Sequence, residues 1–287
     1  MFNAFYNLAQ NPFSETPDVD FFFQSTSHQS ALYKLVQMID AGSGFGVLIG
    51  EVGLGKTLLS RVLLELGNES FYSALIFYPK LNDVELLQAI LGELGESASS
   101  NNLKELFDQI TENLICSSQE NKKTILVVDE AQHLSVDALE VIRMLSNIEM
   151  NKQKLIHIIL IGQPELAKKL NSHECRQIEQ RISTRVQLVA FNSSEVYFYI
   201  KESTETAGAS NYLRFEKEAT DYIYTLSKGN PRLVNMICSL VLNYGAENKN
   251  RLFFKKQIQH ALEHNNYLPS STSLVDTIYQ RVRWVFT

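Results

Sequence analysis

Cysteine is scarce in this chain, and the few cysteines that occur are scattered. The three cysteines are Cys116, Cys175 and Cys238, and none of them forms a CxxC pair. Their spacing excludes a cysteine-rich zinc site and a dithiol redox centre. We expect each cysteine to pack as a small apolar side chain in a reducing compartment.

Long apolar runs are also missing. No stretch approaches the roughly 18 uninterrupted apolar residues of a membrane-spanning helix. The N-terminus has no basic segment followed by an apolar core, so it lacks the pattern of a secretory signal peptide. These absences predict a soluble, cytoplasmic chain.

Basic residues do not outnumber acidic ones. The chain has 26 Lys and Arg against 32 Asp and Glu, a formal net charge of -6. This balance argues against a broad nucleic-acid-binding face and makes a nucleotide and other proteins the expected partners. With 45% hydrophobic and 20% charged residues among 287, one or two ordinary globular domains are expected.

Short apolar runs alternate with amphipathic helical patterns between residues 27 and 191. Because buried strands of a parallel sheet are continuously apolar, this alternation predicts an α/β domain with five parallel strands covered on both faces. The expected strands are 45–49, 74–78, 124–128, 155–161 and 186–189. The expected helices are 27–41, 56–66, 83–94, 102–116 and 135–149.

The rest of the chain has a different pattern. Helical periodicity alone continues through 193–207, 216–227, 231–247 and 254–265, which predicts a small helical lid domain over residues 192–266. Residues 1–26 are rich in aromatics and contain Pro12 and Pro17, so we expect an irregular arm that packs near the nucleotide, rather than a helix. Residues 267–287 form a tail to which no role is assigned.

A glycine-rich segment stands between the first expected strand and the helix after it. Residues 50–57 read Gly-Glu-Val-Gly-Leu-Gly-Lys-Thr and fit GxxxxGK[ST], the phosphate-binding loop or Walker A motif. Glycines let backbone N–H groups approach phosphates, and the helix N-terminus adds partial positive charge. Lys56 would reach the β- and γ-phosphates, and the Thr57 hydroxyl would bind Mg²⁺. The residues expected to contact the nucleotide are Gly50, Glu51, Val52, Gly53, Leu54, Gly55, Lys56, Thr57 and Leu58.

Two adjacent carboxylates follow the apolar run 125–128. A buried strand that ends in Asp129 and Glu130 indicates a site at that edge of the sheet, because burial of unpaired carboxylates is costly. After a phosphate loop, the pair has the form of a Walker B motif; an acidic turn is the alternative. Asp129 would hold Mg²⁺, directly or through water, and Glu130 would orient and activate the attacking water.

Other polar residues lie at strand tips or helix edges. Gln163, after the strand 155–161, is a candidate sensor for that water, with a loop cap as the alternative. Arginines at 176, 181 and 185 are candidates for a finger supplied by a neighbouring subunit, although their spacing alone shows only a basic helix edge. Arg232 begins a helix of the second domain, and we expect it to face the first domain.

These motifs together resemble the AAA+ ATPases of the ExeA, or general secretion pathway A, group, which includes MshM-type pilus-biogenesis ATPases. The likeness extends over nearly the whole chain. Its segments are Asn-Pro-Phe at 11–13, Phe-Phe-Phe at 21–23, His28 with Ala31 and Leu32, the loop 50–57, Asp-Glu-Ala-Gln at 129–132, Leu-Ser-Asn at 145–147, residues 161–166, Gln-Arg-Ile at 180–182 and Gly-Asn-Pro-Arg at 229–232.

The resemblance implies ATP hydrolysis with Mg²⁺, an ATP-dependent homo-oligomer and an active site completed between subunits. It implies Arg181 as the finger, with Arg176 and Arg185 as reserves, and Arg232 as sensor 2. It also makes Pro12 and Phe13 a wall of the adenine pocket. The implied role is the assembly of a secretion or type IV pilus (MSHA-like) system, with an inner-membrane partner and a peripheral position at that membrane.

One departure from this group and two other interpretations stay open. ExeA-type chains usually continue into a membrane helix and a peptidoglycan-binding region, and neither is visible, which favours the short MshM-like form or a chain cut before the membrane. A DNA-associated AAA+ ATPase, such as a TniB-like transposition regulator, shares the middle motifs, but the negative net charge disfavours it. A scaffold that binds ATP and hardly hydrolyses it is disfavoured by Glu130, which such a protein does not need.

Overall fold

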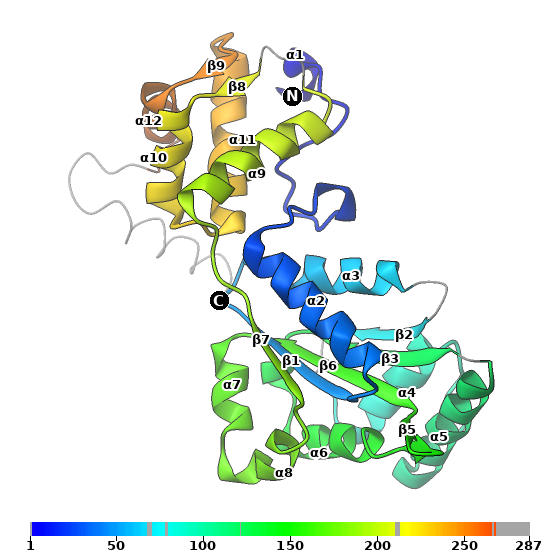
Figure 1. Ribbon diagram of the computed structural model, residues 1–287. Helices are drawn as coiled ribbons and strands as arrows, with labels where there is room; N and C mark the ends of the chain where they lie inside the picture. The colour runs from blue at the N-terminus through cyan, green and yellow to red at the C-terminus, as the bar shows by residue number, and fades with distance from the viewer. Residues whose placement is uncertain are drawn as a thin grey trace. The chain divides into compact units, whose positions relative to one another are not determined.

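The computed structural model describes residues 2–67, 71–77, 80–120, 122–209, 213–265 and 267. The chain divides into two compact units (Figure 1). The α/β unit comprises Thr26–Val52 and the described parts of Lys56–Val189; the helical unit comprises Gly53–Gly55 and the described parts of Met1–Ser25 and Ala190–Thr287. The first 25 residues, expected as a separate arm, thus belong to the helical unit. Apart from residue 267, the expected tail lies outside the described residues.

A five-stranded parallel sheet forms the centre of the α/β unit, as the sequence predicted. Its order is β2-β3-β6-β1-β7. The strands are β1 Phe45–Ile49, β2 Phe71–Ile76, β3 Lys123–Val128, β6 Ile156–Gly162 and β7 Thr184–Gln187. All seven residues of β6 are buried. This burial explains why the inner strands read as continuous apolar runs.

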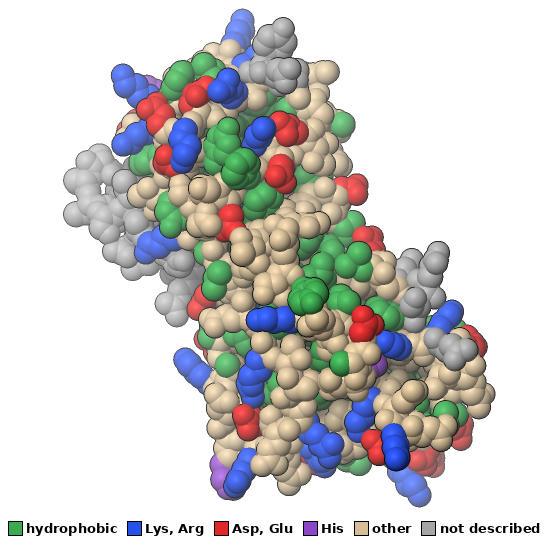
Figure 2. All heavy atoms as spheres, in the orientation of Figure 1, with side chains coloured by type: hydrophobic (Ala, Val, Ile, Leu, Met, Phe, Trp, Pro, Cys, Tyr) green, Lys and Arg blue, Asp and Glu red, His purple; other side chains and the backbone are tan. Residues whose placement is uncertain are grey.

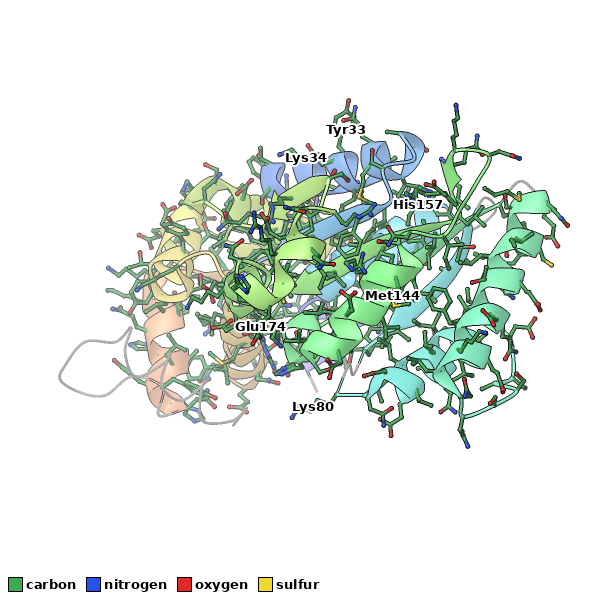
Figure 3. All side chains as sticks on the ribbon, turned by 90° about the horizontal axis from the view of Figure 1, so that it is seen from below. Tyr33, Lys34, Lys80, Met144, His157 and Glu174 are labelled. Carbon is green, nitrogen blue, oxygen red and sulfur yellow. The ribbon has the colours of Figure 1, made fainter. Side chains whose placement is uncertain are left out.

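Helices cover both faces of the sheet. On one face lie α2 Thr26–Asp40 and α3 Lys56–Leu66. There α2 packs so closely that a Cβ on Gly46 of β1 would lie 2.6 Å from the sulfur of Met38. On the other face, α4 Asp83–Glu93, α5 Leu103–Gln119 and α6 Val136–Leu145 share one apolar core with the strands. Figure 3 shows Tyr33 and Lys34 projecting from the outer side of α2.

Several elements of this unit were missed or misplaced by the sequence analysis. The expected helix 135–149 ends at Leu145, and a hairpin of β4 Glu149–Met150 and β5 Gln153–Lys154 follows. The expected strand 186–189 is β7, which begins at Thr184 because an edge strand keeps polar residues on its open side. β2 begins at Phe71 rather than residue 74, and Tyr78 and Pro79 lie outside the described residues. The missed helices are α7 Pro164–Leu170, α8 Arg176–Glu179 and the 3₁₀ turns η2 Ala131–His133 and η3 His173–Cys175.

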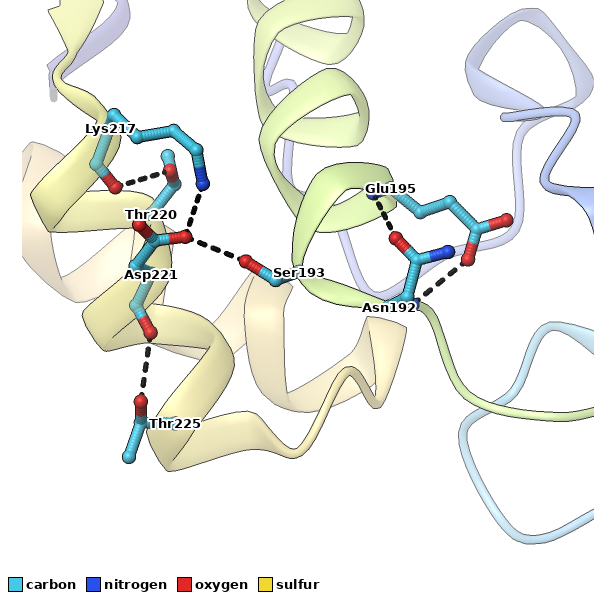
Figure 4. A network of polar contacts seen from close by, with 7 residues as sticks. All are labelled: Asn192, Ser193, Glu195, Lys217, Thr220, Asp221 and Thr225. Carbon is cyan, nitrogen blue, oxygen red and sulfur yellow. Dashed lines mark hydrogen bonds and ion pairs between the residues drawn. The ribbon is translucent and has the colours of Figure 1, made fainter.

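The helical unit has a core of its own. Its main helices are α9 Ser193–Thr206, α10 Lys217–Ser227, α11 Pro231–Glu247 and α12 Lys255–His264. A short parallel pair, β8 Arg214–Phe215 with β9 Leu252–Phe253, was not predicted. Figure 4 shows how α9 begins and meets α10: Asn192 and Glu195 form a capping box, and Ser193 donates a hydrogen bond of 2.6 Å to Asp221. In Figure 2 acidic and basic side chains are interspersed on the visible face of this unit.

The prediction that residues 1–26 contain no helix is wrong. Residues Phe2–Tyr6 form helix α1, and Val19–Phe21 form a 3₁₀ turn, η1. Phe2 and Tyr6 lie one helical turn apart and are both buried, and α1 packs on α11. The Tyr6 hydroxyl donates a 2.9 Å hydrogen bond to the carbonyl of Asn250. Packing of the aromatic face against α11 therefore stabilises a helix that is too short to form alone.

Two further expectations concern single side chains and membrane helices. Cys175 and Cys238 are buried, as expected, but Cys116 is exposed on α5. Within the described ranges, no helix has both the length and the apolarity needed to cross a membrane.

Candidate functional site

The candidate site begins where β1 passes through the glycine-rich loop into α3. Gly50 leaves the sheet at the carboxyl end of β1, and its N–H donates to the carbonyl of Gly162 at 3.1 Å. Lys56 is the first residue of α3, only 5% exposed, and its ammonium donates to the carbonyl of Glu51 at 3.0 Å. Burial lowers the pKa of Lys56, and the nearby carboxylates of Glu130 and Asp129 oppose that shift. The loop thus turns back on the ammonium group, as a phosphate-binding loop does.

Thr57 and Asp129 connect this loop to the tip of β3. The Thr57 hydroxyl donates a hydrogen bond to Asp129 Oδ2, and the Glu130 N–H donates to Asp129 Oδ1 at 2.8 Å. Asp129 is only 2% exposed. Burial raises the pKa of Asp129, and the hydrogen bond from Thr57 acts in the opposite direction. Two motifs therefore meet in space although Thr57 and Asp129 are 72 residues apart in the sequence.

The donor set at this junction fits Mg²⁺. Mg²⁺ prefers hard oxygen ligands and is usually bound by one or two carboxylates together with substrate phosphates and water. The Asp129 carboxylate and the Thr57 hydroxyl supply two such oxygens on adjacent elements. A carboxylate whose burial disfavours its charge gains from a bound cation. In the described part of the chain, no group of three or more His, Cys, Asp and Glu forms a separate metal cage.

Glu130 stands at the site in an unusual backbone conformation. Its φ of 52° and ψ of 35° are left-handed, and the 3₁₀ turn η2 follows it. Gln163 donates from its side-chain amide to Glu130 Oε2 at 3.0 Å, and Gln132 donates to the same oxygen at 2.5 Å. The structure therefore brings the Gln163 amide to the Glu130 carboxylate, and the role of Gln163 as a sensor of the attacking water stays a prediction. Gln132 was noted only as part of a motif, because the left-handed turn that folds it back onto Glu130 has no sequence signal.

The three candidate finger arginines lie on one segment with different surroundings. Arg176 begins α8 and is exposed, and Arg181, shortly after that helix, is also exposed. Arg185, on β7, forms a 3.1 Å ion pair with Glu179. Among the described residues, none of the three hydrogen-bonds to the loop 50–57 or to the carboxylate pair. Arg181 therefore stays a prediction for a contact with a neighbouring subunit.

Of the remaining predicted site residues, Val52 and Leu58 belong to the α/β unit and the others to the helical unit. Gly53, Leu54 and Gly55 are part of it, and the carbonyl of Gly53 accepts a 3.3 Å hydrogen bond from the N–H of Arg232. The Arg232 guanidinium lies 3.9 Å from Glu15. The last two predicted residues, Pro12 and Phe13, are buried, and Phe13 packs in the core of this unit.

The segment Gly-Asn-Pro-Arg at 229–232 has a structural role that explains three of its residues. Gly229 has a φ of +75°, and a Cβ there would lie 1.8 Å from the carbonyl oxygen of Phe191. The Asn230 side chain caps α11 by accepting from the Arg232 and Leu233 N–H groups. Pro231 occupies the first turn, where no N–H is needed. The motif therefore shapes the start of α11 and sets the position of Arg232.

Comparisons with known proteins agree with this geometry. Residues 39–170 match the AAA domain family. The chain is 37% identical over 243 residues to general secretion pathway protein A of Aeromonas hydrophila, a match that covers 84% of this chain and 44% of that protein. This chain therefore spans less than half the length of its curated relative.

Solved structures of low sequence identity share the fold. The Aeropyrum pernix ORC2 protein, in ADPNP–ADP complexes, has a TM-score of 0.67 at 16% identity, with 91% of this chain and 75% of that chain covered. Cdc6p from Pyrobaculum aerophilum has a TM-score of 0.65 at 15% identity, covering 88% and 70%. The Thermotoga maritima RuvB Holliday junction branch migration motor has a TM-score of 0.57 at 15% identity, covering 88% and 73%.

The parallel sheet, the loop and the family match define a P-loop protein of the AAA+ class. Within this class the chain is a relative of general secretion pathway protein A, and the resemblance predicted from the motifs is confirmed.

Proposed function

We propose that this protein binds ATP with Mg²⁺ and hydrolyses it. The observation that supports this most directly is the hydrogen bond from the Thr57 hydroxyl to the buried Asp129 carboxylate, because it joins the phosphate loop to the acidic strand tip. Phosphoryl transfer depends mainly on positioning and electrostatic stabilisation, and such a junction supplies both. The ADPNP and ADP bound by the structurally similar ORC2 protein agree with a nucleotide ligand.

Each residue at the junction has a proposed task. The loop N–H groups and Lys56 bind the β- and γ-phosphates, and Thr57 and Asp129 hold Mg²⁺, which neutralises phosphate charge when bound. Glu130 orients a water molecule and accepts its proton, and Gln163 orients the Glu130 carboxylate. Arg181 as a finger from a neighbouring subunit, Arg232 as sensor 2, and Pro12 with Phe13 beside adenine are predictions that rest on the family resemblance.

We further propose that the ATP cycle drives oligomerisation and the assembly of a secretion or type IV pilus (MSHA-like) system. The identity to a protein named for the general secretion pathway supports this role. The protein would then work in the cytoplasm, peripherally at the inner membrane, on an inner-membrane partner. Identification of proteins that co-purify with the Glu130→Gln variant in the presence of ATP tests this context; the expected result is a secretion or pilus component, and recovery of DNA-transposition proteins alone would contradict it.

Two variants test the enzymatic proposal. Lys56→Ala should abolish ATP binding, because the loop loses its only ammonium. Glu130→Gln should bind ATP with unchanged affinity and lose turnover by about 10² to 10⁴-fold, the contribution of a general base. Titration with a fluorescent ATP analogue and a phosphate-release assay measure the two effects separately.

The matched control is Glu174→Gln, a change of an exposed carboxylate on η3 of the same unit (Figure 3). It should leave affinity and turnover unchanged. Normal binding by Lys56→Ala would refute the phosphate site, and normal turnover by Glu130→Gln would assign the base to another residue.

A further inference from the structure

Lys169 is placed where it can control the turn that follows Glu130. Its ammonium, on α7, donates to the carbonyl oxygens of Gln132 and Leu134 at 2.9 and 2.5 Å. These carbonyls lie within and just after the 3₁₀ turn η2. No carboxylate forms an ion pair with Lys169 among the residues that the structure describes. The charge of Lys169 is therefore directed at the backbone of this turn.

The side chain of Gln132 connects this turn to the Glu130 carboxylate. Its side-chain NH₂ donates to Glu130 Oε2 at 2.5 Å, and its side-chain oxygen accepts the N–H of Gln163 at 3.2 Å. The close fit leaves no room at the end of β6, where a Cβ on Gly162 would lie 2.8 Å from that same oxygen. Both ends of the Gln132 amide are thus engaged, and its rotation is blocked.

Glu130 needs such support because its own backbone resists the observed conformation. A left-handed φ is sterically unfavourable in a residue other than glycine, because Cβ comes too close to the carbonyl oxygen that follows. Without the contacts from Gln132 and Lys169, the turn would relax toward a right-handed conformation. The carboxylate would then leave its place beside Asp129.

We propose that Lys169 and Gln132 are positioning residues for hydrolysis: Lys169 holds the turn, and Gln132 holds Glu130 Oε2. In the described chain Oε1 accepts no hydrogen bond from protein, so it is the oxygen oriented to accept a proton from the attacking water. The inference rests on the proposed ATPase function and names residues that act through Glu130, without contact to the nucleotide.

Three single variants test the proposal. Gln132→Ala and Lys169→Met should each lower kcat by about 10- to 100-fold, because a misplacement near 1 Å can have that effect. Their ATP affinity should be unchanged, since neither residue touches the loop 50–57. Lys169→Arg should restore most of kcat, because a guanidinium can also donate to two carbonyls. Lys168→Met, on the exposed neighbour in α7, is the matched control and should behave as the unmodified protein.

A second set of measurements separates positioning from general stability. In the Glu130→Gln background, addition of Gln132→Ala should lower turnover no further, because residues that act as a unit are non-additive. A multiplicative loss in the double variant, or equal kcat for Gln132→Ala and the unmodified protein, would overturn the inference alone. A lack of ATP hydrolysis by the unmodified protein would overturn the proposed function and the inference together.

Discussion

Individual glycines at two sites are required by close contacts of their backbone. Gly53 has a φ of +81°, and a Cβ there would lie 2.7 Å from Asn230 and 2.8 Å from Cβ of Arg232. At Gly229 the clash would be with the carbonyl of Phe191, whose N–H in turn donates to the Gly229 carbonyl at 2.9 Å. Two separate constraints thus require glycine at position 53: the phosphate-loop motif and the close packing of the helical unit.

Gly229→Ala should destabilise the helical unit strongly. The added methyl meets a backbone oxygen, which cannot swing away as a side chain does, and the left-handed φ adds strain. We expect a loss of about 2 kcal/mol or more in the free energy of unfolding, measured by urea denaturation. Gly92→Ala, in α4 with nothing near its Cβ position, is the control and should be neutral or stabilising. Equal stability of both variants would contradict the close contact.

At this scale the phosphate loop and both carboxylates could be located from the sequence, because each belongs to a short contiguous motif. Lys56, Thr57 and Asp129 meet as expected. Gln132 and Lys169 were not recognised, because their contacts depend on a backbone turn and on a helix that begins at Pro164. The contacts of Lys169 are made to backbone carbonyls, which every residue type has, and the contacts of Gln132 form only because the turn folds its side chain back onto Glu130.

Among the elements, the central strands were the easiest to predict and the edges the hardest. Burial on both faces forces a continuous apolar run in β3 and β6, whereas β7 has a polar, half-open side. The inner strand β6 also contains a residue that no periodicity explains. His157 is buried there, and its Nδ1 has no hydrogen-bond partner in the described part of the chain (Figure 3).

His157 should make the α/β unit sensitive to acid. Burial, helped by the charge of Lys123, lowers the pKa of His157 from 6.5 to about 4. As the pH falls from 6.5 to 4, His157 binds a proton in the unfolded chain but not in the folded chain, so the free energy of unfolding falls. This pKa shift contributes on the order of 3 kcal/mol to the free energy of unfolding, and that contribution is lost progressively as the pH falls over this range.

His157→Leu should therefore flatten the dependence of stability on pH between 4 and 6.5. Urea denaturation at several pH values measures the slope. His173→Leu, which changes an exposed histidine of the same unit, should leave the slope unchanged. The same steep slope in His157→Leu and in the unmodified protein would show that another group titrates.

For the whole molecule, the two units have separate apolar cores. The sequence pattern changes from alternating strands and helices to helices alone after residue 191, and Val189 is the last residue of the α/β unit. The pattern did not assign the N-terminal residues to the helical unit, because a five-residue helix is too short to show a helical periodicity. Their place depends on contacts with α11, far along the sequence.

An assembly that completes its sites between subunits should show complementation. Arg181→Ala and Lys56→Ala should each be inactive alone, and a mixture should recover part of the ATPase activity, because one pairing keeps both an intact loop and an intact arginine. When Arg185→Ala is mixed with Lys56→Ala in place of Arg181→Ala, less ATPase activity should be recovered, since the Arg185 guanidinium already pairs with Glu179. Phosphate release across a range of mixing ratios is the measurement, and no recovery at any ratio would argue against a shared site.

The docking of α1 has a practical consequence for work with this protein. Gly245 leaves a hollow on α11 that the Tyr6 ring fills, with the Tyr6 hydroxyl at 2.3 Å from where a Cβ would be. A shortened version that starts after Tyr6 would uncover Phe253 and the aliphatic side of α11 together. Such a fragment should be prone to aggregate, so affinity tags are best joined through a spacer that leaves the first helix intact.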